Sequence, residues 1–81
     1  MKLNNEENKI KNNKNQEKIY ILYHIICLKD IIDNTDNANI FKYLYIKKES
    51  IDTIIDECNI TERTLYNYRL KFVTYYNKLF N

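Results

Sequence analysis

The sequence predicts an all-α fold, a single domain of three to four helices preceded by a mobile arm. The chain of 81 residues contains no glycine and no proline, which turn-rich β folds use heavily. Apolar residues recur at helical spacing in several segments, and two of these lie close together within residues 50–70. A chain this short builds only a marginal core unless a partner adds to it.

The N-terminal segment, residues 1–18 (MKLNNEENKIKNNKNQEK), is rich in Asn and Lys and poor in apolar residues. Such a segment cannot bury enough surface to offset the entropy cost of ordering. We therefore expect a flexible, solvated arm. Phosphate contact by its lysines is the alternative, although Glu6, Glu7 and Glu17 dilute their charge.

The most apolar run of the chain, residues 19–32 (IYILYHIICLKDII), predicts a buried helix over residues 19–33. It is shorter than the roughly 20 apolar residues that a membrane span needs, so no membrane partner is expected. Apolar stripes on two sides require cover on two sides, and either a second copy or the C-terminal helix can supply the second cover. The dimer surface predicted from this run consists of Tyr20, Tyr23 and Ile26.

The next segment, residues 33–37 (DNTDN), is a loop by composition and leads into a helix over residues 38–47. Ile40, Phe41, Leu44 and Tyr45 give that helix an inward face. A support helix follows over residues 50–58, with Ser50 as its N-cap and Asp52 in its first turn.

A short turn and a last helix complete the pattern. Asn59 tolerates the left-handed conformation that ends a helix, and Thr61 can cap a helix over residues 61–80. Leu65, Tyr68 and Phe72 form the inward face of this helix. Its C-terminal part (KFVTYYNKLF) can alternatively fold as a β-hairpin wing, which the helical spacing of its apolar residues disfavours.

Two short amphipathic helices joined by a tight turn have the spacing of a helix-turn-helix, whose second helix reads the major groove. Arg binds guanine and Asn binds adenine through two hydrogen bonds each, so an outer face with both residue types suits base reading. The predicted base-reading residues are Glu62, Arg63, Tyr66 and Asn67. The predicted phosphate-contacting residues are Lys47, Lys48, Ser50, Thr61, Arg69 and Lys71. The alternative is a helical bundle in which this polar face is only solvated.

Residues 40–71 resemble the C-terminal promoter-recognition domain, region 4, of bacterial sigma factors and small phage or plasmid regulators built on it. The phrase NITERTLYNYR matches the turn, cap and Arg-containing recognition helix of that family, and IFKYLYIKKESID is similar to the preceding helix and linker. Ile55 stands where the family prefers a small residue, and Asn59 replaces its usual Gly.

The resemblance implies a sequence-specific double-stranded DNA-binding protein, either a transcriptional regulator or an accessory factor of a plasmid or phage. Two alternatives remain. One is a sigma-like adaptor that binds RNA polymerase or another protein without reading DNA. The other is a winged helix-turn-helix protein that binds the replication origin of a mobile element.

Charge is uneven along the chain. Residues 61–81 carry 4 − 1 = +3 and residues 19–37 carry 1 − 3 = −2, which places the basic end at the predicted reading helix. A single helix-turn-helix of this charge binds weakly, so we expect a homodimer on paired half-sites.

Other functional classes lack a signature in the sequence. No nucleophile with a positioned base and no metal-ligand set is recognisable, so neither an enzyme, a cofactor nor a metal is expected. Cys27 and Cys58 lie in apolar runs and there is no secretory signal, which predicts reduced thiols in a cytoplasmic protein.

Overall fold

The structure is a computed structural model that describes residues 4–80, and all regular elements in that range are helical. The all-α prediction is confirmed. Across the described residues, no helix is long and apolar enough to cross a membrane. The elements are α1 (Asn4–Lys11), the 3₁₀ turn η1 (Asn13–Asn15), α2 (Gln16–Asp33), α3 (Asn37–Phe41), the π-helical segment η2 (Lys42–Ile46), α4 (Ile51–Cys58) and α5 (Glu62–Phe80).

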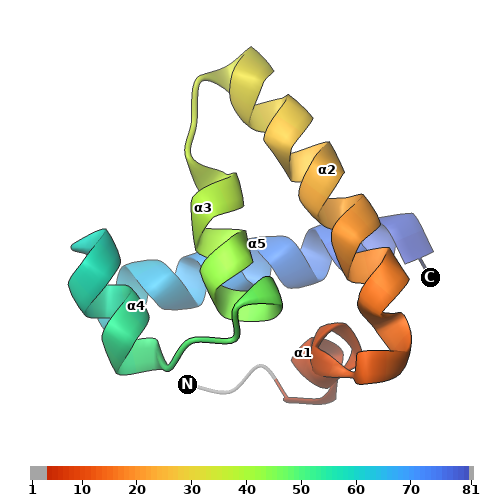
Figure 1. Cartoon of the computed structure of the whole chain (residues 1–81), viewed down its shortest axis with the longest axis horizontal. Helices are drawn as coiled ribbons and strands as arrows, with labels where there is room; N and C mark the ends of the chain where they lie inside the picture. Colours follow the sequence, from red (N-terminus) through yellow and green to blue (C-terminus); the bar gives the residue numbers. More distant parts are fainter. Residues whose placement is uncertain (1–3, 81) are drawn as a thin grey trace.

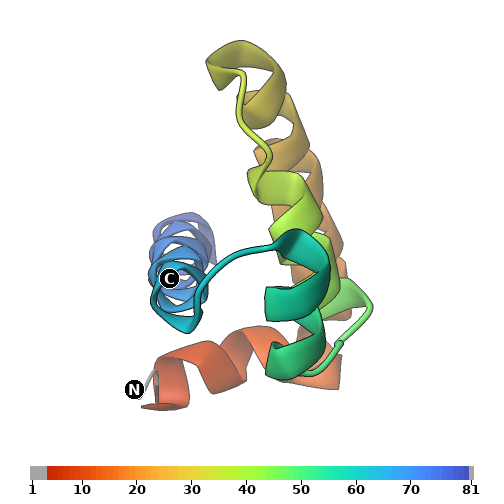
Figure 2. The same ribbon diagram turned by 90° about the vertical axis from the view of Figure 1, so that its left-hand side faces the viewer.

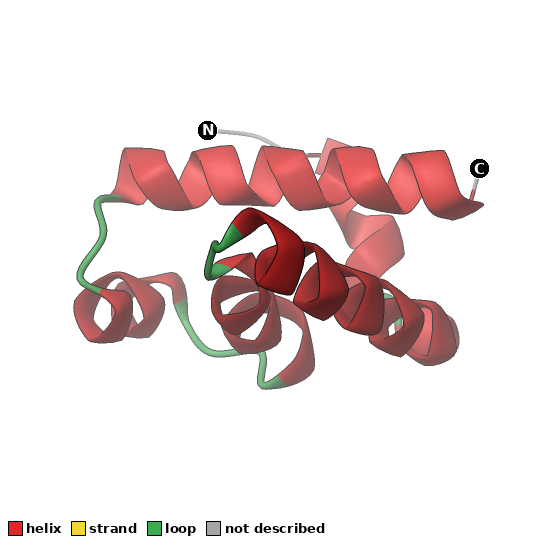
Figure 3. Cartoon of the chain, turned by 90° about the horizontal axis from the view of Figure 1, so that it is seen from above, coloured by secondary structure: helices red, strands yellow, loops and turns green. Residues whose placement is uncertain are grey.

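The long helix α5 forms one layer, and α2, α3 and α4 form the other. Figure 1 shows α2 and α3 as the two arms of an inverted V, with α5 crossing behind them and α4 beside its N-terminal half. Figure 2 looks along α5 and shows α1 running beneath the two layers. The view from above in Figure 3 separates α5 from the helices that it covers.

Aromatic residues fill the space between the layers. The ring centroids of Phe41 and Tyr45 lie 4.9 Å apart, and Phe72 of α5 meets Phe41 edge-on at 5.2 Å. Edge-on and tilted pairs of this kind are favoured by the quadrupoles of the rings. The remaining buried apolar residues are Ile10, Ile19, Leu22, Ile26, Ile40, Leu44, Ile54, Leu65, Val73 and Tyr76.

The N-terminal segment corrects the expectation of a mobile arm. Residues 4–18 are almost entirely helical, Ile10 is fully buried, and Glu7 is only 4% exposed. The prediction of a mobile arm rested on the small number of apolar residues, and a local sequence pattern does not reveal the ion pair between Glu7 and Arg69 of α5. Residues 1–3 of the predicted arm lie outside the described part of the chain.

The segment predicted as one helix over residues 38–47 is divided between α3 and the wider π-helical turn of η2. Lys48 then adopts a left-handed conformation, with φ of 56°, which ends the helical path and directs the chain toward α4. π-Helical turns are rare and often occur near functional sites. This one presents Leu44 and Tyr45 to the core together.

The C-terminal segment remains helical through Phe80, so the β-hairpin wing is wrong. Phe72, Val73 and Tyr76 recur at helical spacing, and all three are buried. Their burial in the shared core stabilises the helix over this whole stretch.

Candidate nucleic-acid interface

The two helices of the candidate interface, α4 and α5, begin with the same capping pattern. The Ser50 hydroxyl accepts a hydrogen bond from the Thr53 amide at 3.1 Å, and the Thr61 hydroxyl accepts one from the Thr64 amide at 3.1 Å. Each capping hydroxyl also donates to the hydroxyl of the threonine three residues later. Side-chain caps of this type fix where a helix starts.

The turn between these helices occupies residues 59–61. Asn59 has φ of 54°, and its amide donates to the Ile55 carbonyl, which closes α4 as the sequence predicts. Ile60 is half-buried and packs against the hydrophobic core, to which Ile54 of α4 and Leu65 of α5 belong. The turn and these apolar contacts together fix α4 against the first turns of α5.

The outer side of α5 carries a continuous row of exposed residues, in which each position lies three or four residues from a member on the neighbouring turn. Arg63 and Asn67, one turn apart near the start of the helix, begin this row. Glu62 is exposed beside them, whereas the predicted base-reading residue Tyr66 is half-buried. We call the row the α5 stripe; it consists of Arg63, Asn67, Leu70, Lys71, Thr74 and Lys78.

The predicted phosphate-contacting residues do not form one group. Lys47 and Lys48 are exposed in the segment that leads into α4, and the Lys47 ammonium lies 5.1 Å from the ring centroid of Tyr43. Lys71 belongs to the α5 stripe, where its ammonium lies 3.3 Å from Asn37 Oδ1. The Ser50 and Thr61 hydroxyls already donate within their caps, so neither has its proton free for a phosphate.

Arg69 is a correction to the predicted phosphate contacts. Its Nε donates to Glu7 Oε2 at 2.8 Å and its Nη2 donates to Glu7 Oε1 at 2.7 Å, a two-bond pair between α5 and α1. The Tyr45 hydroxyl donates to the same Oε2 at 3.0 Å. The Arg69 side chain is only 14% exposed, so its guanidinium is not available to a phosphate. Its pair with Glu7 holds α1 against α5 instead.

The charge state of this cluster follows from its partners. Burial alone would raise the pKa of the Glu7 carboxyl, but hydrogen bonds from Arg69 and Tyr45 and the charges of Lys11 and Arg69 hold it below its ordinary value. Burial and the neighbouring Glu7 charge raise the pKa of Tyr45. The pair is therefore ionised, and Tyr45 stays a neutral donor.

Sequence reasoning missed Glu7, and it predicted that Tyr45 faces inward but not that its hydroxyl binds Glu7. The only local signal was Ile10, which stands one turn after Glu7 in an otherwise polar segment and is fully buried. The pairing with Arg69 bridges 62 positions of the chain, which no local pattern can reveal.

The electrostatic character of the two helices differs. The exposed charges of α5 are Arg63, Lys71 and Lys78 against Glu62, or 3 − 1 = +2. In contrast, α4 (Ile51–Cys58) carries 0 − 3 = −3. Asp52, Asp56 and Glu57 are all exposed on α4. A polyanion is therefore attracted to α5 and repelled by α4.

The predicted dimer surface is corrected at Ile26. This side chain is 1% exposed and lies in the core, and Tyr23 is half-buried with its ring stacked 6.2 Å from that of Phe41. Only Tyr20, at 45% exposure, remains on the surface. The side of α2 that carries Ile26 is covered within the chain.

Both cysteines are unpaired thiols and half-buried, and burial raises the pKa of the Cys58 thiol. Among residues 4–80, no group of His, Cys, Asp or Glu is arranged to hold a metal ion.

Comparison with known proteins gives no relative from which to transfer a function. No protein-family model matches the chain, and no curated protein or solved structure matches it significantly. The resemblance to sigma region 4 therefore stays a prediction.

Proposed function

We propose that the chain is a sequence-specific double-stranded DNA-binding protein in which the N-terminal half of α5 enters the major groove. The observation that supports this most is the pairing of Arg63 and Asn67. Both are exposed, they lie one turn apart, and the caps and the turn at residues 59–61 fix the start of their helix. These two side chains make the most discriminating contacts to guanine and adenine.

In this proposal α4 braces α5 and the rest of the α5 stripe supports the approach to the duplex. Lys71 and Lys78 neutralise phosphates along the groove, and Lys47 and Lys48 contact the backbone at the edge. Arg69 takes no part because Glu7 binds it. The resemblance to sigma region 4 supports a role as a regulator of transcription or as an accessory factor of a mobile element.

The acidic surface of α4 favours a second candidate. In a helix-turn-helix the first helix passes over the phosphate backbone, where exposed Asp52 and Asp56 would be repelled. The same carboxylates suit a basic surface on a protein, as in an adaptor that binds RNA polymerase without reading DNA. Substitution of both residues by Asn should strengthen DNA binding under the first proposal and weaken protein binding under the second.

Selection of bound sequences from a random duplex pool, at two salt concentrations, tests the proposal. Arg63→Ala should cost about 1 to 3 kcal/mol of discrimination at one base position. Lys71→Ala should weaken binding to all sequences and lower the salt slope by about one. Lys14→Ala removes the same charge from η1, and an equal loss of binding there would favour the alternative in which the N-terminal lysines contact phosphate.

Two results would count against DNA reading. A sequence preference that survives in the Arg63→Ala, Asn67→Ala double variant would exclude α5 as the reading helix. Weak wild-type binding that salt abolishes, with no preferred sequence, would favour the adaptor and direct the search toward a protein partner.

A further inference from the structure

One side of α2 remains apolar and exposed in the single chain. Ile21, Leu28 and Ile32 are 48%, 63% and 81% exposed, and half-buried Ile25 lies in line with them. The spacing of these positions is four, three and four residues, which is that of a helix-packing stripe. We call this row the α2 seam: Ile21, Ile25, Leu28 and Ile32.

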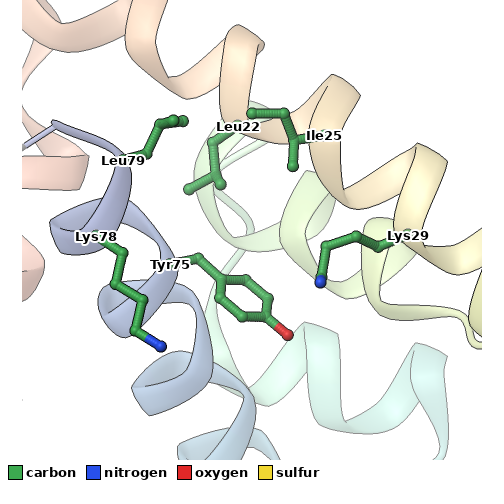
Figure 4. A pocket seen from close by; sticks show the side chains of 6 residues that line it. All are labelled: Leu22, Ile25, Lys29, Tyr75, Lys78 and Leu79. Atoms are coloured by element: carbon green, nitrogen blue, oxygen red, sulfur yellow. The ribbon is translucent and has the colours of Figure 1, made fainter.

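The seam borders a groove between α2 and α5 with a volume of about 220 Å³. Figure 4 shows Leu22 and Ile25 on one side and Tyr75 and Leu79 on the other, with the ammonium groups of Lys29 and Lys78 at the rim. Because Ile25 belongs to both features, the seam and the groove form one continuous apolar surface.

We propose that a second copy of the chain covers this surface, with the two α2 helices packed antiparallel. The seam is complementary to itself in that direction. If the two-fold axis passes between positions 26 and 27, Ile21 faces Ile32 of the second copy and Ile25 faces Leu28 of the second copy. Every seam residue then meets another seam residue, as an isologous contact requires.

The charges at the two ends of α2 support the antiparallel direction. Asp33 and Asp36 are exposed at its C-terminal end, where they carry −2. At the other end lie Glu17 and Lys18, whose charges cancel, and the Lys18 ammonium is 5.5 Å from the ring centroid of Phe80. Antiparallel packing keeps the two acidic ends apart, brings Lys18 toward the acidic end of the second copy and opposes the helix dipoles. Parallel packing would place the acidic ends side by side.

This interface differs from the one predicted from sequence and does not depend on DNA binding. Ile26 and Tyr23 face the core, so the apolar side of α2 that still lacks a packing partner is the seam. The test therefore uses the full-length protein without DNA, and its result is separate from that of the duplex selection.

Sedimentation equilibrium of the wild type and of single-charge variants measures the association. Ile32→Glu and Leu28→Glu should each raise the dimer Kd at least about tenfold, because each removes a buried apolar contact. Ile31→Glu is the matched control: Ile31 is 78% exposed, like Ile32, but lies about 100° around the helix and off the seam. Circular dichroism melts confirm that each variant folds.

Mixing two variants tests the register. Ile21→Lys and Ile32→Glu should each associate weakly alone, and their mixture should associate more tightly, since the antiparallel register pairs the new opposite charges. A monomeric wild type would overturn the proposal. So would an Ile31→Glu variant that is impaired as much as Ile32→Glu, or a mixture that is no tighter than its components.

Discussion

Two arginines on α5 have opposite environments. Arg63, in the first turns of the helix, is exposed on the α5 stripe, whereas the Arg69 side chain is 14% exposed and bound by Glu7. They have the same chemistry and lie on one helix, yet they face different surroundings, because α1 bonds to α5 at Arg69 and Asn77 while Arg63 is exposed. The contrast shows that a distant segment of the same chain can bury and bind a basic residue on a candidate reading helix, and so withdraw it from a ligand.

The largest effect should come from breaking the buried pair. Arg69→Ala should lower the free energy of unfolding by about 3 to 5 kcal/mol, because it leaves the Glu7 carboxylate buried without its cation. Urea denaturation measures the change. Arg63→Ala is the control and should change stability by no more than about 0.5 kcal/mol. Equal effects of the two substitutions would show that α1 does not depend on Arg69.

Glu7→Gln should have an intermediate effect on the free energy of unfolding, and the size of this effect should depend on pH. It should cost about 2 kcal/mol near neutral pH, since hydrogen bonds to a charged group are replaced by weaker neutral ones. In the wild type the Glu7 pKa is lower in the folded state than its ordinary value of 4.5. Its contribution is therefore fully present above that value and is lost as pH falls through the lower folded pKa.

Urea midpoints between neutral pH and strongly acidic pH check this linkage. The wild type should lose stability faster than Glu7→Gln in the acid range, so that the two curves converge. Curves that stay parallel would mean that other carboxyl groups carry the acid dependence.

The smallest effect should come from the caps. Thr61→Ala should cost about 1 kcal/mol of stability, because the Thr64 amide loses its acceptor. Thr61→Ser keeps the cap and should be close to wild type in thermal melts. Under the proposed function, Thr61→Ala should also weaken duplex binding at unchanged sequence preference, because the start of α5 becomes less well fixed.

Local patterns predicted the end of the chain better than its beginning. The ends of α4 and the start of α5 are determined by residues close together in the sequence. Ser50 caps α4 through the Thr53 amide, Asn59 closes α4 with positive φ, and Thr61 caps α5 through the Thr64 amide. The position of α1 is determined by residues far along the chain, because Tyr45 and Arg69 bind Glu7. Local sequence patterns predict disorder for a segment with few apolar residues when the residues that stabilise it are far along the chain.

The sequence by itself determined the helical class, the turn at Asn59 and the exposure of Arg63 and Asn67, because capping, left-handed turns and helical spacing are local properties. Only the tertiary structure decided that Arg69 belongs to Glu7, that Ile26 lies in the core and that Ile32 does not. Apolar spacing marks more than one stripe on α2. Which stripe is buried depends on where α3 and α5 lie, and their positions are fixed by contacts far apart in the sequence.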